Sequence, residues 1–255
     1  MQGARVEEFV HGGRTMLVHR LGEAPGPSFV LVHGIGVGST YLRPLARALA
    51  GFGRVHLLEL PGMGAAPRPA RPMSVEDFAA IVSAHLLDAD VRDPVLIGHS
   101  MGTQIVIEAS LRHPERFRRL VLMGTVVDPE ERTALRQSLR LLEDSMVESP
   151  SANAAVFADY FRTGVRWYLA TLPAMLGYRT EEALTHVTAD LVIMRGGRDP
   201  ISRPGWTERL RRIVPGARFV EVPGRGHAVM FAPTDAVVAP IAELAGVRWP
   251  RGEAG

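Results

Sequence analysis

Short apolar runs rich in β-branched residues alternate with helix-like stretches over most of this 255-residue chain. We predict strands at residues 5–10, 14–20, 28–33, 54–59, 94–98, 118–123, 190–195 and 217–222. The first two have alternating or mixed polarity and flank His11-Gly12-Gly13, which indicates an antiparallel pair at one edge of a sheet. The other six are continuously apolar and separated by helices, the pattern of a parallel sheet covered on both faces. The sequence therefore predicts an α/β fold with an eight-stranded, mostly parallel sheet flanked by helices.

One long segment interrupts this alternation after the sixth predicted strand. Residues 128–185 contain no strand pattern, but apolar residues recur there at helical spacing. A structureless loop of about 58 residues would be unusual in a compact domain. We therefore expect a helical cap at residues 128–185, inserted between the core segments 1–127 and 186–255.

Composition argues against several classes of protein. The chain has no cysteine, so disulfides, thiolate metal sites and cysteine nucleophiles are excluded. The formal net charge is only +2 and no basic block is present, which argues against a nucleic-acid partner. The N-terminus lacks the pattern of a secretion signal, and no apolar run approaches the ~18 residues of a membrane span. We therefore expect a cytoplasmic protein without a membrane span.

The pentapeptide Gly98-His99-Ser100-Met101-Gly102 lies between a predicted strand and a predicted helix at residues 101–112. In that context, G-x-S-x-G describes a nucleophile elbow, a strained turn that lifts the serine hydroxyl out of the backbone. Both glycines suit such a turn, because a Cβ at either position would collide across it. The motif alone carries a false-positive risk, so the rest of the chain must supply the partners of Ser100.

A serine nucleophile needs a base, an acid that orients the base, and donors for the oxyanion. Asp199 and His227 each follow a predicted parallel strand, and the order Ser100, Asp199, His227 is the one expected for such a fold. All three would therefore emerge at the carboxyl end of the sheet. The backbone N–H groups of Ile35, in a glycine-rich loop, and of Met101 are the predicted oxyanion donors.

Two further residues near this edge have alternative interpretations. We interpret His33 as a structural residue that holds the glycine-rich loop. Asp128, just past the sixth predicted strand, is a rival of Asp199 for the role of the acid. Its neighbour Pro129 favours a helix cap for Asp128 instead.

These motifs resemble those of the α/β-hydrolase superfamily, from about Arg14 to Gly246. VHGIG resembles the oxyanion loop, GHSMG the elbow, and MRGGRDPIS and PGRGHAVMF the segments that carry the acid and the histidine. Glu59, where Asp is commoner, and Thr103, where a third glycine is frequent, depart from the pattern without touching the triad. The resemblance implies an α/β-hydrolase fold with a helical cap after the sixth strand. The serine argues against the branches that attack with a carboxylate.

The predicted function is that of a serine hydrolase, specifically a carboxylesterase acting on small to medium apolar or aromatic acyl esters. We expect no metal, no cofactor, a small-molecule substrate, and a monomer or homodimer. Hydrolysis of a C–C bond, a lactone or a thioester, cofactor-free perhydrolysis, and a weakly catalytic ligand-binding receptor remain alternatives on the same fold. Aromatic residues of the cap either pack between its helices or line a pocket. The candidate substrate-binding residues are His99, Phe157, Phe161, Trp167 and Tyr168.

Overall fold

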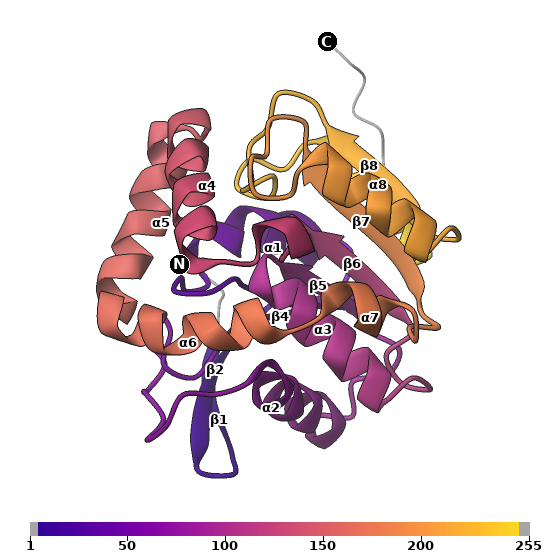
Figure 1. Ribbon diagram of the computed structural model, residues 1–255. Coiled ribbons are helices and arrows are strands. Elements are labelled where there is room, and N and C mark those ends of the chain that lie inside the picture. The colour runs from indigo at the N-terminus through magenta and orange to yellow at the C-terminus, as the bar shows by residue number, and fades with distance from the viewer. Residues whose placement is uncertain (1–4, 250–255) are drawn as a thin grey trace.

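The computed structural model describes residues 5–249, whose strands form one eight-stranded sheet in the order β1-β2-β4-β3-β5-β6-β7-β8 (Figure 1). Strand β2 pairs antiparallel with β1 and with β4, and all other neighbouring strands are parallel. The predicted α/β fold with a mostly parallel sheet is therefore confirmed. The strands are β1 Arg5–His11, β2 Arg14–Leu21, β3 Ser28–Val32, β4 Arg54–Glu59, β5 Val95–His99, β6 Arg119–Met123, β7 Asp190–Gly196 and β8 Arg218–Val222.

Helices cover both faces of the sheet. Successive residues of a strand point to opposite faces, so a strand that is apolar throughout needs cover on both. The covering helices are α1 Arg43–Ala50, α2 Val75–Asp88, α3 Met101–Arg112, α8 Pro204–Ile213 and α9 Asp235–Leu244. In β3, Val30 belongs to the apolar core that α2, α3 and α8 share, whereas its neighbour Leu31 belongs to the core that α1 and α9 share. Both side chains are fully buried.

Helix α2 begins at a capping motif that its sequence encodes. Ser74 and Asp77 form a reciprocal capping box at its N-terminus, with both hydrogen bonds at 3.2 Å. Near the other end, His85 lies 3% exposed in the core, where its Nε2 is 3.1 Å from Nδ1 of His56 on β4. This pair of buried imidazoles lies away from the carboxyl ends of the strands and explains His85 as a core residue.

Between β6 and β7 the chain forms helices only. They are α4 Ala134–Val147, α5 Pro150–Thr163, α6 Val165–Gly177 and α7 Thr180–Leu184, preceded by a short 3-10 turn at Pro129–Glu131. These four α-helices are referred to below as the inserted helices. Side-chain hydroxyls start the first two, since Thr133 accepts from the N–H of Arg136 and Ser149 from that of Ala152.

A buried carboxylate fastens the inserted helices to the loop that follows β3. Asp159 of α5 is 1% exposed and accepts from the N–H of Gly38 at 3.1 Å and from Oγ1 of Thr40 at 3.2 Å. Its third partner is the guanidinium of Arg162, one turn further along the same helix, at 3.1 Å. The position of α5 is therefore coupled to the glycine-rich loop. Within residues 5–249, no helix is long and apolar enough to cross a membrane.

Candidate active site

Ser100 lies at a sharp turn between β5 and α3. Its backbone has φ 54° and ψ −123°, an unusual conformation for a residue with a side chain. A Cβ on Gly98 would collide with the backbone of Gly102, and a Cβ on Gly102 would collide with the carbonyl oxygen of Val32. Both glycines are thus needed where the strand, the turn and the helix approach one another. The strained turn presents Ser100 to a cavity that it lines.

Asp199 and His227 form a buried pair at the same edge of the sheet. Asp199 follows β7, and its Oδ2 accepts from Nδ1 of His227, which follows β8, at 2.8 Å. The other oxygen, Oδ1, accepts from the N–H groups of Ile201 at 2.8 Å and Ser202 at 2.9 Å. These two amides fix the carboxylate, which therefore holds the imidazole with its Nε2 free to act. Within residues 5–249, Nε2 of His227 has no hydrogen-bond partner, and His227 lines the same cavity as Ser100.

Charge separation within the pair is favoured despite its burial. Burial alone would raise the pKa of Asp199, but the His227 ring and two backbone amides outweigh it and lower that pKa. Burial alone would lower the pKa of His227, but the carboxylates of Asp199, Asp144 and Glu148 outweigh it and raise the pKa to about 9. The His227 ring therefore has a raised proton affinity beside an ionised Asp199.

The glycine-rich loop after β3 lies against the elbow. A Cβ added to Gly34 would lie 3.0 Å from Cβ and 3.4 Å from Oγ of Ser100. No hydrogen bond from the N–H of Ile35 or of Met101 to a protein acceptor is found in the described part of the chain. Both donors are therefore available. His33 has the structural role expected of it, because its Nδ1 donates to the Gly34 carbonyl at 2.8 Å while its Nε2 accepts from the N–H of Leu60 at 2.9 Å.

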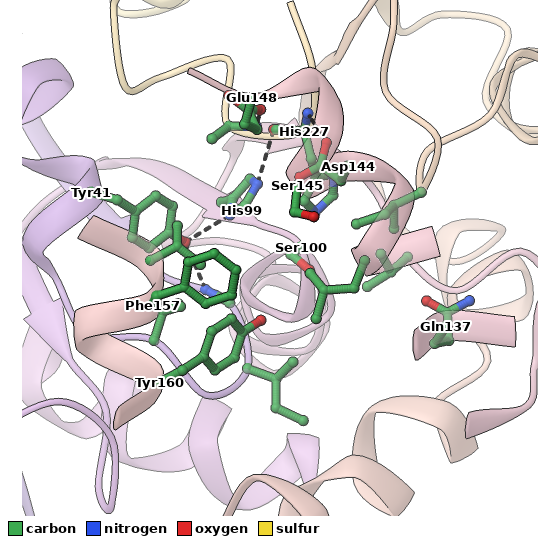
Figure 2. A pocket seen from close by; sticks show the side chains of 18 of the residues that line it. Tyr41, His99, Ser100, Gln137, Asp144, Ser145, Glu148, Phe157, Tyr160 and His227 are labelled. Carbon is green, nitrogen blue, oxygen red and sulfur yellow. Dashed lines mark hydrogen bonds between the residues drawn. The ribbon is translucent and has the colours of Figure 1, made fainter. Parts of the chain in front are cut away.

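His99 connects this loop to the histidine segment. Its Nδ1 accepts from the hydroxyl of Tyr41 at 2.7 Å, and that hydroxyl accepts from the N–H of Gly34 at 3.0 Å. Its Nε2 donates to the carbonyl of His227 at 3.2 Å (Figure 2). Burial, reinforced by the nearby His227, lowers the pKa of His99 well below its ordinary value, so the ring is neutral. His99 lines the cavity as a substrate contact would, but both ring nitrogens are bound by the protein.

The inserted helices complete a cavity of about 310 Å³ over Ser100. Its walls from α5 and α6 are mostly apolar or aromatic, whereas α4 contributes two leucines beside polar side chains such as Gln137, Ser138 and Ser145. No arginine is found among its lining residues in the described chain, whereas two carboxylates of α4 and its end, Asp144 and Glu148, reach it. The lining side chains of the inserted helices include Gln137, Leu141, Leu142, Asn153, Val156, Phe157, Tyr160, Tyr168 and Met175.

The candidate substrate contacts fall into two groups. Phe157 and Tyr168 lie on the cavity wall. Phe161 of α5 does not line the cavity and is 91% exposed. Trp167 packs against Gly62, where a Cβ would be 2.8 Å from its Cζ2. Phe161 and Trp167 are therefore corrected from cavity residues to an exposed residue and a packing residue. Tyr160, which the sequence analysis did not single out, takes a place on the wall beside Tyr168.

Asp128, the rival acid, has a structural contact instead. Its Oδ1 accepts from the N–H of Glu130 at 3.1 Å and so caps the 3-10 turn before α4. No hydrogen bond joins Asp128 to His227 within residues 5–249. The geometry thus favours Asp199 as the partner of the imidazole.

Comparisons with known proteins agree with this fold. The model of the alpha/beta hydrolase family matches residues 29–239. The chain belongs to this family and is a hydrolase.

Individual relatives are more distant. Pimeloyl-[acyl-carrier protein] methyl ester esterase from Chromobacterium violaceum is 28% identical over 254 residues, covering 89% of this chain and 97% of that protein. Polyketide synthase ThaQ from Burkholderia thailandensis is also 28% identical over 90% of this chain, which spans only 12% of that protein. The crystal structure of the enol-lactonase from Burkholderia xenovorans has the same fold, with a TM-score of 0.81, 20% identity, and coverage of 93% of this chain and 99% of that one.

Proposed function

We propose that this protein is a serine carboxylesterase that hydrolyses small to medium esters with an apolar or aromatic acyl group. The observation that carries the proposal is the 2.8 Å hydrogen bond between Asp199 and His227, with the free Nε2 of His227 on the same cavity as the elbow residue Ser100. A nucleophile, a base and an orienting acid on three different segments are the set that acyl transfer needs.

In this mechanism, Ser100 Oγ attacks the ester carbonyl while Nε2 of His227 takes its proton. Asp199 keeps the other proton of the ring on Nδ1 and stabilises the imidazolium. The N–H groups of Ile35 and Met101 donate to the oxyanion of the tetrahedral intermediate. The imidazolium then protonates the leaving alcohol, and a water molecule activated by His227 hydrolyses the acyl-enzyme.

The cavity supports neutral substrates over anionic ones. Its lining combines apolar side chains with the carboxylates Asp144 and Glu148 and lacks an arginine among the described residues. A substrate with a second carboxylate would be repelled by these two acids and would find no arginine to pair with in the described lining. The esterase of Chromobacterium violaceum, named for a methyl ester, supports ester chemistry.

Covalent labelling tests the nucleophile. A fluorophosphonate probe should label the wild type and not Ser100→Ala, whose unfolding transition should match that of the wild type. Hydrolysis of p-nitrophenyl esters should be lost in the same variant. Labelling that persists in Ser100→Ala would refute the assignment, and slow single-turnover acylation of the wild type would favour a receptor.

A substrate panel tests the acyl group. We expect activity on p-nitrophenyl esters to pass through a maximum at short to medium chains, because a cavity of about 310 Å³ limits length. Within one chain length, a dimethyl ester of a dicarboxylic acid should be hydrolysed faster than its monomethyl ester. Equal rates for this pair would contradict the charge argument, and faster hydrolysis of a lactone would shift the proposed substrate class.

A further inference from the structure

Two carboxylates of the inserted helices hold the backbone of the proposed base. Oδ1 of Asp144, on α4, accepts from the N–H of His227 at 2.9 Å. Oε1 of Glu148, the C-cap residue that follows α4, accepts at 2.7 Å from the N–H of Ala228, the residue after His227. Asp144 is only 7% exposed, and Figure 2 shows both acids beside His227. The bonded residues are 83 and 80 positions apart in sequence, so these hydrogen bonds form only when α4 is docked on the core.

The histidine segment is shaped to receive these acids. Gly226 leaves the space for them, because a Cβ there would lie 2.6 Å from Oε1 of Glu148 and 3.0 Å from Oδ1 of Asp144. Gly224, two residues earlier, has φ +71°. Such a glycine-rich segment has little intrinsic stiffness, so its position depends on the groups that bind it. On the other side, the His99 side chain donates to the carbonyl of His227, and backbone hydrogen bonds from Val229 to His227 and from Arg198 to Arg225 add to it.

We propose that Asp144 and Glu148 are positioning residues, which hold the His227 segment from α4 so that docking of this helix assembles the catalytic site. The inference rests on the proposed function, since it assigns no chemistry to the acids themselves. Their role is to fix the main-chain atoms that carry the imidazole. A base displaced by about 1 Å from the proton that it abstracts can lose about a hundredfold in rate.

The acids also act on the imidazole through their charge. His227 is faced by Asp199 beyond β7, by Asp144 and Glu148 of the inserted segment, and by the neutral His99 at the end of β5. All three carboxylates raise the pKa of His227. Burial in turn raises the pKa of Asp144 to about 6, although His227 and its N–H oppose this. Loss of either charge should therefore move the acidic limb of the pH–rate profile to lower pH, since the base becomes neutral earlier.

Paired substitutions separate position from charge. Asp144→Asn and Glu148→Gln keep an oxygen that can accept the hydrogen bond, whereas Asp144→Leu and Glu148→Leu do not. The matched control is Glu143→Leu, because Glu143 lies on the same helix but its partner is Arg140. For each variant, kcat and KM are measured with a neutral p-nitrophenyl ester from about pH 6 to about pH 10. Rates are expressed per site labelled by fluorophosphonate at completion, so that unfolded protein does not count.

We expect the Leu variants to lose at least about tenfold in kcat at every pH. The Asn and Gln variants should stay within about threefold of the wild type above pH 9, with the acidic limb at lower pH. Glu143→Leu should match the wild type in rate and pH profile. Gly226→Ala keeps both acids but places a methyl group between them and the segment, so it should show the loss of the Leu variants even where these fold poorly.

Leu variants and Gly226→Ala that keep the wild-type kcat and pH profile would overturn the positioning role. Equal losses in the Asn, Gln and Leu variants would overturn it as well, because the acceptor is still present in the first two. Failure of the proposed function has a different signature: the wild type would then not be labelled at Ser100 at all.

Discussion

Replacement of Asp199 by Asn changes one atom that the imidazole depends on and leaves the rest of its site in place. Oδ1 of Asp199 accepts from the N–H groups of Ile201 at 2.8 Å and Ser202 at 2.9 Å. The amide oxygen of Asp199→Asn can keep both of these hydrogen bonds. The NH₂ group then faces Nδ1 of His227, where the carboxylate accepted a hydrogen bond at 2.8 Å. Because two donors cannot pair, Nδ1 must present its lone pair and the ring proton moves to Nε2. The base is then in the wrong tautomer to take the proton of Ser100.

The expected loss in kcat is about 10⁴-fold, the size of effect that a wrong tautomer has in a serine protease with a Ser-His-Asp triad. At about 1.36 kcal/mol per factor of ten, this corresponds to about 5 kcal/mol of transition-state stabilisation. Steady-state hydrolysis of a p-nitrophenyl ester measures it, with the unfolding transition as the check that the protein is folded.

Asp128→Asn is the matched control, because Asp128, which follows β6, is the rival of Asp199 for the role of the acid. Its Oδ1 caps a turn through the N–H of Glu130, and Asn caps as well as Asp does. We expect kcat within about twofold of the wild type. A loss below tenfold in Asp199→Asn, or a comparable loss in Asp128→Asn, would refute the assignment of Asp199 as the acid.

Three further predictions concern stability and are measured by urea unfolding. Asp159→Leu leaves a buried N–H of the glycine-rich loop without its acceptor and should cost about 1–3 kcal/mol, whereas Asp159→Asn should cost less; equal costs would contradict the hydrogen-bond argument. Burial lowers the pKa of His56 to about 3 and that of His85 to about 4, so the unfolded chain binds more protons below about pH 6.5. Between about pH 6 and pH 4, the free energy of unfolding should therefore fall by up to about 1 kcal/mol per pH unit for each histidine. His85→Gln should reduce this slope, and an unchanged slope would contradict the titration argument. Leu122→Ala, at a fully buried position, should cost about 2–5 kcal/mol, while Leu135→Ala, at a side chain 71% exposed, should cost less than about 0.5 kcal/mol; similar costs would argue against the observed packing.

The central strands of this protein can be predicted from its sequence because they are buried on both faces. Residues 54–59 were predicted as a strand and form β4 with the same bounds, and the sixth predicted strand begins only one residue before β6. Local chemistry also defines the start of α2, where Ser74 and Asp77 are three residues apart. The order of the strands in the sheet depends on long-range packing and has no local signal.

The residues on the cavity walls were harder to predict from the sequence than Ser100, Asp199 and His227. Phe157 and Phe161 share a helical face, yet only Phe157 lines the cavity, whereas Phe161 is 91% exposed. Trp167 and Tyr168 are adjacent on α6 and so point about 100° apart, one toward Gly62 and the other into the cavity. Helical periodicity gives the faces of a helix but not which face meets the core.

The acids at the end of α4 had no signal in the sequence, because their partners are main-chain N–H groups far along the chain. They give α4 two roles at once: it forms a wall of the cavity and holds the segment of His227. A substitution at Asp144 that widens the cavity would therefore also displace the base, so selectivity and kcat should change together there. Phe157 and Tyr168 line the cavity from α5 and α6 without a hydrogen bond to that segment in the described chain. Changes of substrate range with little loss of kcat should consequently come from these two positions rather than from α4.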